Sequence, residues 1–365
     1  MKMGKPRVGI THGDFNGIGY EVLLKAVCAE GICDLFTPVI FGDWRIIEYA
    51  RKNLLPDMPQ MQRIRDASEV KDGRINVVDL RIQDVDITPG KPTQASGKAA
   101  VASLEAAVDA VNGGMVDVIV TAPICKEACQ SESFHFPGHT EYLEAHAGED
   151  CKAQMILFSD SLRVALVTTH LPVSEISGAI TKEKVVDSIK RLAGTLVSDF
   201  SIERPKIAVL SLNPHNGDGG LLGNEEKDVI EPAVAESESD RVMAFGPYAA
   251  DGFFGSGMYK QFDGILAMYH DQGLAPFKAL AGERGVNFTA GLPFVRTSPD
   301  HGTAFDIAWK GKADPTSMRE AIYRAIDIWR NRSVYRRASR NPLRKAKLER
   351  TADIAIGDTN DSKEL

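Results

Sequence analysis

Short runs of β-branched and apolar residues alternate along the chain with longer segments in which apolar residues recur at helical spacing. Residues 7–11 have the pattern of a strand, a glycine-bearing loop follows, and residues 20–29 place apolar side chains on one helical face. The alanine-rich segment 97–111 predicts a closely packed helix, and residues 116–121 predict the next strand. Such alternation is typical of strand-helix-strand units, so we expect an α/β fold with mainly parallel sheets.

The middle of the chain has a different pattern. Residues 154–158 and 163–168 flank the turn residues Asp160 and Ser161, which predicts a hairpin and therefore some antiparallel pairing. Helices over 181–197 and 224–235 and strands over 206–212 and 264–268 follow. A last helix is predicted from Asp314 and Pro315 through Trp329. We therefore expect two α/β/α domains, one of residues 1–125 with about 300–335 and one of residues 126–299, and a charged tail over 336–365.

The 365 residues carry a net charge of −7, and 43% of them are hydrophobic. These values are typical of a globular protein, and no apolar run approaches the roughly 20 residues of a membrane helix. The negative net charge argues against nucleic acid or an acidic membrane as a partner. Five cysteines without paired short spacings, and an N-terminus without an apolar signal-peptide core, predict a reducing, cytoplasmic location.

Clusters of polar residues follow five of the predicted strands. They occupy residues 11–14, 121–123, 169–172, 213–216 and 269–273. Ligands of open α/β sheets bind beyond the carboxyl ends of the strands. We therefore expect these clusters to form a functional site at one edge of the sheet.

Three of these clusters share a design in which a histidine caps the strand and turn residues follow it, namely those of His170, His215 and His270. Imidazoles brought together at strand ends suit a divalent metal that keeps open positions for a substrate. A hydrogen-bonded loop residue is the alternative for each histidine taken alone. Asp271 and Asp251 are candidates for direct ligands or for acceptors of the second imidazole nitrogen, and surface carboxylates are the alternative.

Other polar residues predict an anionic substrate. His139 and Thr140 begin a short helix, where free backbone N–H groups favour a phosphate or carboxylate; a helix cap and a solvated histidine are the alternative. Lys278, Asn287 and Arg296 interrupt apolar or glycine-rich surroundings, and two cations with an amide suit a phosphate and a carboxylate. Surface salt bridges are the default alternative for a single lysine or arginine. The glycines of residues 13–19 match neither the dinucleotide fingerprint nor a P-loop.

Seven ordered runs together resemble the 4-hydroxythreonine-4-phosphate dehydrogenase family over about residues 7–330. The resemblance implies a two-domain enzyme of the isocitrate and isopropylmalate dehydrogenase type, with its active site in the interdomain cleft. It also implies a homodimer that shares each active site between subunits. The runs are Gly13-Asp14 through Gly17-Ile18-Gly19 to Glu21, Thr121-Ala122-Pro123 to Lys126, Gly138-His139-Thr140-Glu141, Thr169-His170-Leu171-Pro172, Leu212-Asn213-Pro214-His215, Tyr269-His270-Asp271-Gln272-Gly273, and Gly291-Leu292-Pro293 to Arg296-Thr297-Ser298.

The resemblance also assigns roles to individual residues. His170, His215 and His270 match the metal ligands. Residues 300–308 look like the adenosine-binding loop of the wider superfamily, which binds NAD or NADP without the dinucleotide fingerprint. The substrate-binding matches are His139, Thr140, Lys278, Asn287 and Arg296, and the proposed cofactor-binding residues are His301, Gly302, Thr303 and Ala304.

The implied reaction is oxidation of 4-(phosphooxy)-L-threonine by NAD, with loss of CO₂, to 3-amino-2-oxopropyl phosphate, a precursor of pyridoxal phosphate. A divalent cation (zinc, magnesium or cobalt) fits this chemistry because it stabilises an alkoxide and an enolate. Lys126, Asp251 and Asp271 are the candidate proton acceptors. One alternative is oxidation of a four-carbon sugar acid phosphate, threonate or erythronate 4-phosphate, and another is a non-catalytic protein that binds metal or phosphate.

Two positions depart from the family pattern. Phe15 and Asn16 stand where the family more often has Pro-Ala, and Trp309 stands where the superfamily loop usually has glycine. Neither departure falls on the expected metal or substrate residues, so both bear on the cofactor and on substrate specificity rather than on the type of reaction.

Overall fold

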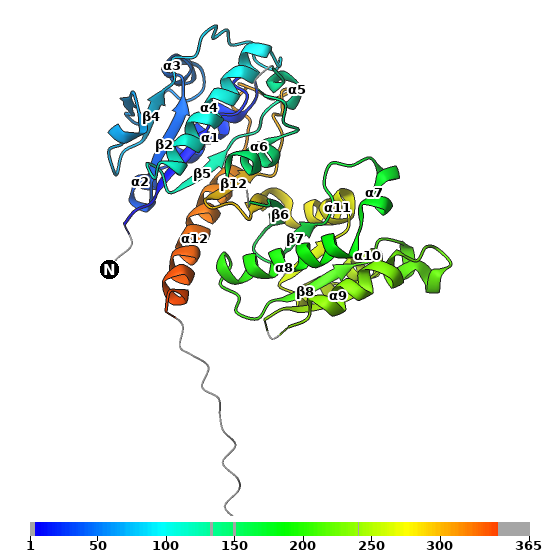
Figure 1. The fold of residues 1–365 in the computed structure, drawn as a ribbon. Coiled ribbons are helices and arrows are strands. Elements are labelled where there is room, and N and C mark those ends of the chain that lie inside the picture. The colour runs from blue at the N-terminus through cyan, green and yellow to red at the C-terminus, as the bar shows by residue number, and fades with distance from the viewer. Residues whose placement is uncertain (1–3, 132–133, 149–150, 240, 342–365) are drawn as a thin grey trace, which may run out of the picture.

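The computed structural model describes residues 4–131, 134–148, 151–239 and 241–341, and these residues build one sheet of twelve strands (Figure 1). Its strand order is β3-β4-β2-β1-β5-β12-β11-β6-β7-β10-β8-β9. The strands are β1 (Arg7–Thr11), β2 (Thr37–Gly42), β3 (Gln62–Ile64), β4 (Asn76–Asp79), β5 (Val118–Thr121), β6 (Gln154–Phe158), β7 (Arg163–Leu166), β8 (Lys206–Leu210), β9 (Met243–Tyr248), β10 (Gly264–Ala267), β11 (Val286–Ala290) and β12 (Val295–Pro299).

Pairing is parallel from β3 to β12 in that order and again from β7 to β9, and it is antiparallel at β12/β11, β11/β6 and β6/β7. The predicted α/β class with mainly parallel pairing is therefore confirmed, as is the hairpin of β6 and β7. The division into domains at residues 125 and 300 stays a prediction.

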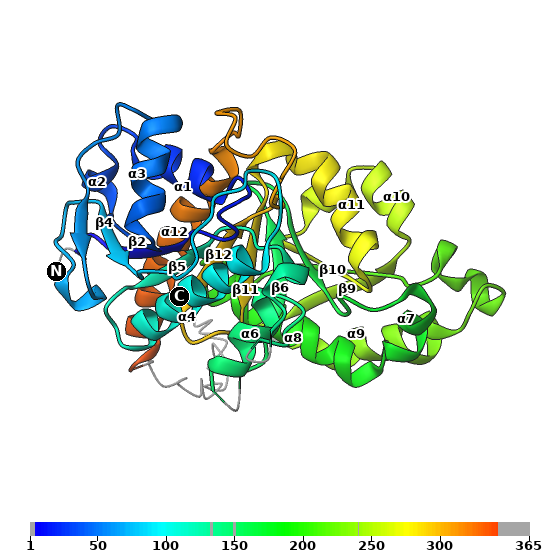
Figure 2. The same ribbon diagram turned by 90° about the horizontal axis from the view of Figure 1, so that it is seen from above.

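Helices cover both faces of this sheet (Figure 2). In the part of the chain that the structure describes, no helix has the length and apolar character needed to cross a membrane. The α-helices are α1 (Gly19–Val27), α2 (Ile32–Leu35), α3 (Trp44–Asn53), α4 (Gln94–Asn112), α5 (Lys126–Cys129), α6 (His139–His146), α7 (Val173–Ala179), α8 (Lys182–Ser198), α9 (Glu231–Ser237), α10 (Ala250–Gly255), α11 (His270–Ala281) and α12 (Thr316–Ser339).

Two predicted helices differ from the observed ones by more than a few residues or in type. The segment expected as one helix over 224–235 is a π-helical turn, Glu226–Ile230, followed by α9. The last helix does not end at Trp329 but continues to Ser339, into the segment expected as a tail; residues 342–365 of that tail lie outside the described residues. Polar contacts stabilise this extension, because Arg332 donates to both carboxylate oxygens of Asp199 at 2.7 and 2.8 Å. Apolar periodicity does not report such a contact.

The two faces of the sheet are packed differently. On one face a single apolar core runs from Val8 and Ile10 on β1 to Val209 on β8, and α1, α8 and α12 contribute to it. On the other face there are two separate cores, one beneath α4 and one that includes Phe253 and Phe277. Between these two cores lies a polar stripe of the central strands, formed by Thr121, Asn287, Thr289, Arg296 and Ser298.

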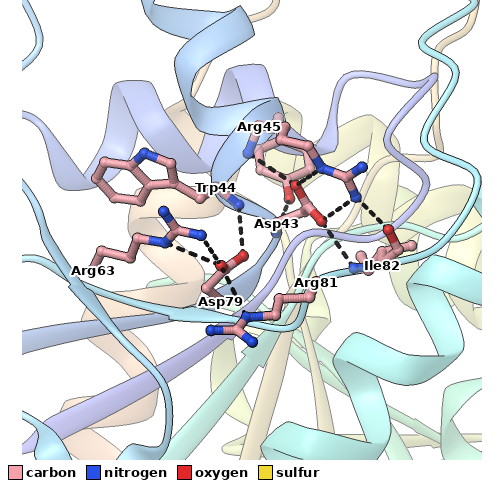
Figure 3. A network of polar contacts seen from close by, with 8 residues as sticks. Asp43, Trp44, Arg45, Arg63, Asp79, Arg81 and Ile82 are labelled. Atoms are coloured by element: carbon pink, nitrogen blue, oxygen red, sulfur yellow. Dashed lines mark hydrogen bonds and ion pairs between the residues drawn. The ribbon is translucent and has the colours of Figure 1, made fainter.

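Polar contacts hold the carboxyl ends of β2 and β4 together (Figure 3). Asp43, directly after β2, accepts hydrogen bonds from the Arg45 side chain at 2.9 and 2.8 Å and from the Ile82 N–H at 2.9 Å. Asp79, the last residue of β4, accepts from the Trp44 N–H at 3.0 Å and from the Arg63 guanidinium at 3.0 and 2.5 Å. These two carboxylates fix where α3 begins and where the chain leaves β4.

A histidine of the first polar cluster is fully buried next to this network. The His12 ring stacks on Tyr20 with 4.9 Å between centroids, and the Tyr20 hydroxyl accepts the Asp43 N–H at 3.0 Å. Burial lowers the pKa of His12 to about 4, although neighbouring backbone groups and the Asp43 carboxylate oppose the shift. The folded protein therefore holds His12 neutral at pH values where the unfolded chain protonates it.

We expect Asp79→Asn to lower the free energy of unfolding by about 1–3 kcal/mol, because it removes the charge that the Arg63 guanidinium pairs with. Urea titration would measure the loss. Asp84→Asn is the matched control, since Asp84 is an exposed residue of the following loop. Equal stability of the two variants would show that the network does not stabilise the fold.

The neutral state of His12 makes the stability depend on pH. Between about pH 6.5 and pH 4 the unfolded chain binds the extra proton, so the free energy of unfolding falls as the pH is lowered. Through His12, the free energy of unfolding of the parent should fall by about 2 kcal/mol between pH 7 and pH 5, and His12→Phe should not show this part of the fall. His146→Gln, at an exposed histidine, should leave the parent's pH dependence unchanged. A His12→Phe variant with the parent's full pH dependence would contradict the assignment.

Candidate active site

A cavity of about 270 Å³ opens at the polar stripe of the sheet. Glu141, Asp300 and Thr121 line it together with residues of the predicted site. The strand ends, the start of α6 and the loop after β12 thus meet where the sequence predicted a site. The predicted residues that line it are Lys126, His139, Thr140, His170, Lys278, Asn287, Arg296, His301 and Gly302.

Arg296 is the most unusual residue of this cavity, because its side chain is charged and only 2% exposed. Its Nε and Nη2 donate to the Thr121 hydroxyl at 3.1 and 2.6 Å, and its Nη1 donates to the Thr289 hydroxyl at 2.9 Å. No carboxylate of the described residues forms an ion pair with it. Burial lowers the pKa of Arg296 below its ordinary value, and the negative charge of Glu141 partly opposes this shift. An anion in the cavity would supply the missing counter-charge.

His139 and Thr140 begin α6 at the side of the cavity. The His139 Nε2 is buried and finds no hydrogen-bond partner among the described residues. Burial, reinforced by the positive charges of Arg296 and Lys126, holds the pKa of His139 well below its usual value. His139 is therefore neutral at physiological pH, and it can donate one hydrogen bond to a ligand.

The structure brings together two of the three predicted metal ligands. The rings of His170 and His270 lie 6.0 Å apart between centroids, whereas His215 is exposed in a separate segment where it has a φ of 54°. Within the described residues of one chain, no set of three histidine, cysteine or carboxylate side chains is placed to hold a metal. A single subunit thus provides at most part of the predicted ligand set.

The surroundings of His170 and His270 nevertheless fit a metal. The Nδ1 of His170 lies 3.3 Å from Glu141 Oε1, and the Nδ1 of His270 lies 2.7 Å from Asp271 Oδ1. A carboxylate that accepts the Nδ1 proton leaves Nε2 with its lone pair free, which is the arrangement of metal-ligating histidines. His170 and His270 would hold such an ion, and Asp271 fits a supporting role better than a direct one.

The three candidate proton acceptors differ in whether they line the cavity. Lys126 lines the cavity, whereas Asp251 and Asp271 are exposed and do not line it in the described part of the chain. Lys278, on the opposite wall, pairs with Asp300 at 3.2 Å. Desolvation raises the pKa of Asp300, and the positive charge of Lys278 opposes that rise. Asp300 places a second carboxylate at the cavity, besides Glu141.

The predicted cofactor loop divides into two parts. His301 and Gly302 line the cavity, and the His301 Nδ1 donates to the Gly302 carbonyl at 3.0 Å. The His301 Nε2 is buried without a partner among the described residues, which fits an acceptor for a cofactor hydroxyl. Thr303 and Ala304 do not line the described cavity. The Thr303 carbonyl accepts the Ile18 N–H at 3.0 Å, and Ala304 has a φ of 40°.

The two departures from the family pattern contact each other. Trp309 adopts a φ of 60°, a left-handed conformation that explains why glycine is usual in this loop. Its indole Nε1 donates to the Phe15 carbonyl at 2.8 Å. The Asn16 side chain accepts the Thr88 N–H at 2.8 Å. These bonds tie the first glycine loop to the cofactor loop and to the segment before α4.

Sequence reasoning missed Thr289 and gave no role to Thr121, Glu141 or Asp300. Thr289 lies two residues after Asn287 on β11, so the alternation of a strand places both on one face. That spacing could have predicted Thr289 on the sheet face that carries the cavity. The other three stand inside quoted motifs, but nothing in the spacing says which charge or hydroxyl each one meets.

The chain matches the model of the family described as pyridoxal phosphate biosynthetic protein PdxA over residues 34–325. It is 53% identical to a 4-hydroxythreonine-4-phosphate dehydrogenase of Bacteroides thetaiotaomicron, with 97% of both chains covered. It is also 39% identical to a protein of Oceanobacillus iheyensis named as a D-threonate 4-phosphate dehydrogenase, over 89% of this chain and 98% of that one.

Solved structures agree with this match. A 4-hydroxythreonine-4-phosphate dehydrogenase of Klebsiella pneumoniae superposes with a TM-score of 0.76 at 34% identity, covering 90% of this chain and 99% of the other. A terephthalate 1,2-cis-dihydrodiol dehydrogenase of Burkholderia xenovorans is more distant, with a TM-score of 0.59 at 26% identity, covering 89% and 98%. The ordered motifs, the cavity that they line and these matches together show that the chain belongs to the PdxA family of pyridoxal phosphate biosynthetic proteins.

Proposed function

We propose that this protein oxidises 4-(phosphooxy)-L-threonine with NAD and releases CO₂, giving 3-amino-2-oxopropyl phosphate for pyridoxal phosphate synthesis. The observation that carries this proposal is the buried Arg296 guanidinium, which has no carboxylate partner among the described residues and lies in a cavity of substrate size. Family membership and the names of the relatives support the same reaction.

The residues of the cavity suit a substrate with two anionic ends. Arg296 and Lys278 provide positive charge on different walls, and Asn287 provides an amide whose Oδ1 is buried and unpartnered within the described chain. His139 and the start of α6 add neutral donors. Held at both ends, the substrate presents its secondary hydroxyl at a fixed position, which lowers the entropic part of the barrier.

Two bound groups complete the reaction. His170 and His270 would hold a divalent cation, which would stabilise negative charge on the substrate oxygens, and NAD or NADP would supply the oxidising power when bound. His301 and Gly302 would contact the cofactor, since both line the cavity. Lys126 is our candidate for the group that takes the hydroxyl proton, because it alone of Lys126, Asp251 and Asp271 lines the described cavity.

The third metal ligand is proposed to come from a partner subunit of a homodimer. His215 is exposed and is followed by Leu221, which is 79% exposed, and Val173 in α7 is 83% exposed. A hydrogen bond of 2.6 Å from Ser177 in α7 to Glu225 links the two segments, and exposed apolar side chains that lie close together are typical of an interface. A dimer would cover them and bring His215 to the cavity of the other subunit. We further propose a cytoplasmic location, where phosphorylated metabolites and reduced thiols are found.

Oxidation of D-threonate 4-phosphate is the second candidate. The relative from Oceanobacillus iheyensis bears that name, and the same cations and histidines would serve a hydroxyl group in place of the amino group. Glu141 favours the amino substrate, because its Oε2 is buried without a hydrogen-bond partner in the described chain, and a carboxylate attracts an ammonium group more strongly than a hydroxyl.

The direct test follows NADH formation with 4-(phosphooxy)-L-threonine and with D-threonate 4-phosphate, after chelation and after adding back divalent ions. We expect the amino substrate to be oxidised faster, chelation to abolish activity, and added ion to restore it. His215→Ala should lower activity even in excess metal. Oxidation of the threonate substrate alone would establish the second candidate, and no oxidation of either would refute both.

Arg296→Lys should lower kcat/KM roughly 10- to 150-fold, because lysine keeps the charge but loses the planar set of donors. Thermal stability should fall only moderately, since lysine replaces one buried cation with another and leaves part of the hydrogen bonds to Thr121 and Thr289 unmade. Arg284→Lys is the control, because Arg284 is exposed and its one ion pair, with Asp160 at 3.8 Å, is a loose surface contact in the described chain. Full activity of Arg296→Lys would assign Arg296 a structural role.

A further inference from the structure

We infer that Thr121 and Thr289 are positioning residues that aim the Arg296 guanidinium at the anionic group of the substrate. Both hydroxyls are buried, and each accepts directly from the guanidinium, at 2.6 and 3.1 Å for Thr121 and 2.9 Å for Thr289. The inference rests on the proposed function only in taking Arg296 as the anchor of the substrate anion.

The sheet itself places the three residues together. The antiparallel register of β11 and β12 pairs Phe288 with Thr297, so Thr289 and Arg296 occupy the next positions of the two strands. On its other side β12 runs parallel to β5, whose last residue is Thr121. Arg296 therefore crosses the sheet face between two hydroxyls that come from its two neighbouring strands.

Hydroxyl partners suit an anchor for an anion better than carboxylates do. A carboxylate would neutralise the guanidinium and compete with the substrate, whereas a threonine accepts a hydrogen bond and leaves the positive charge in place. Glu141, which also lines the cavity, forms no ion pair with Arg296 in the described chain, and its Oε1 lies 3.3 Å from the His170 Nδ1. The guanidinium thus keeps its charge, and because it is shielded from bulk water a bound anion is attracted to it more strongly than in water.

The hydrogen bonds also determine which donors remain. A guanidinium has five N–H groups, and the Nε and Nη2 edge, which most often forks onto a carboxylate, is occupied by Thr121. Thr289 takes one proton of Nη1. One N–H on Nη1 and one on Nη2 are left for the substrate, so the two threonines select the edge of Arg296 that the anion meets.

The experiment uses Thr289→Val, which keeps the shape but removes the acceptor, and Thr289→Ser, which keeps the acceptor. We expect Thr289→Val to raise KM for the phosphorylated substrate and the inhibition constant for inorganic phosphate about 10-fold or more, with a smaller change in kcat and an unchanged KM for NAD. Thr289→Ser should restore both constants. Thr121→Val and Thr121→Ser should behave in the same way.

Thr297→Val is the matched control, because Thr297 is a buried threonine of β12 whose hydroxyl donates to the Ala321 carbonyl at 2.8 Å on the other face of the sheet. It should lower stability without changing the phosphate constant. In an Arg296→Lys background, Thr289→Val should have no further effect on that constant, since the group that it positions has been replaced.

Three results would overturn the inference: an unchanged phosphate constant in Thr289→Val, failure of Thr289→Ser to restore it, or an equal rise in Thr297→Val. If Thr289→Val does not fold, Thr121→Val gives the same decision. Stabilisation of the protein by inorganic phosphate, measured as a rise in Tm, needs no substrate oxidation. A parent that gains stability from phosphate while Thr289→Val does not would support the inference even if the proposed oxidation were refuted.

Discussion

A positive charge buried in the face of a β-sheet is the constraint on which this structure depends. Arg296 has threonine hydroxyls on both sides, and no carboxylate in the described chain neutralises it. A charge in such a setting is unfavourable unless a ligand or hydrogen bonds compensate for it. The protein meets this requirement by leaving the surrounding sheet face polar, so this face cannot have one continuous apolar core.

The packing follows from that requirement. One face of the sheet carries an uninterrupted core that runs from Val77 on β4 to Ala244 on β9, while the opposite face has two cores with the polar stripe between them. The cavity therefore lies where two well-packed regions meet, and its walls come from elements anchored in different cores. Rigid walls around an uncompensated charge favour tight selection of an anion by position as well as by charge.

Much of this could be predicted from the sequence, because alternating strands and helices leave a periodic signal and polar clusters after strands mark one sheet edge. Nine predicted site residues line the cavity, among them Lys126, His139 and Arg296. The roles of Thr289 and Glu141 could not be predicted, since that of Thr289 depends on which side chain lies across the β11/β12 pair, and that of Glu141 on how α6 packs beside His170. The place of His215 also could not, because its distance from His170 is set by how distant elements pack.

The hydrogen bond from Trp309 to the Phe15 carbonyl has a consequence for how this sequence can vary. Trp309, the unusual residue of the cofactor loop, donates this bond to the backbone of Phe15, an unusual residue of the first glycine loop. A change of Trp309 to glycine would relieve the left-handed conformation and at the same time remove the donor that holds the first loop. The effect of a substitution in one loop therefore depends on the residues of the other. Replacing either loop alone with that of a related enzyme would disturb the cofactor side of the site.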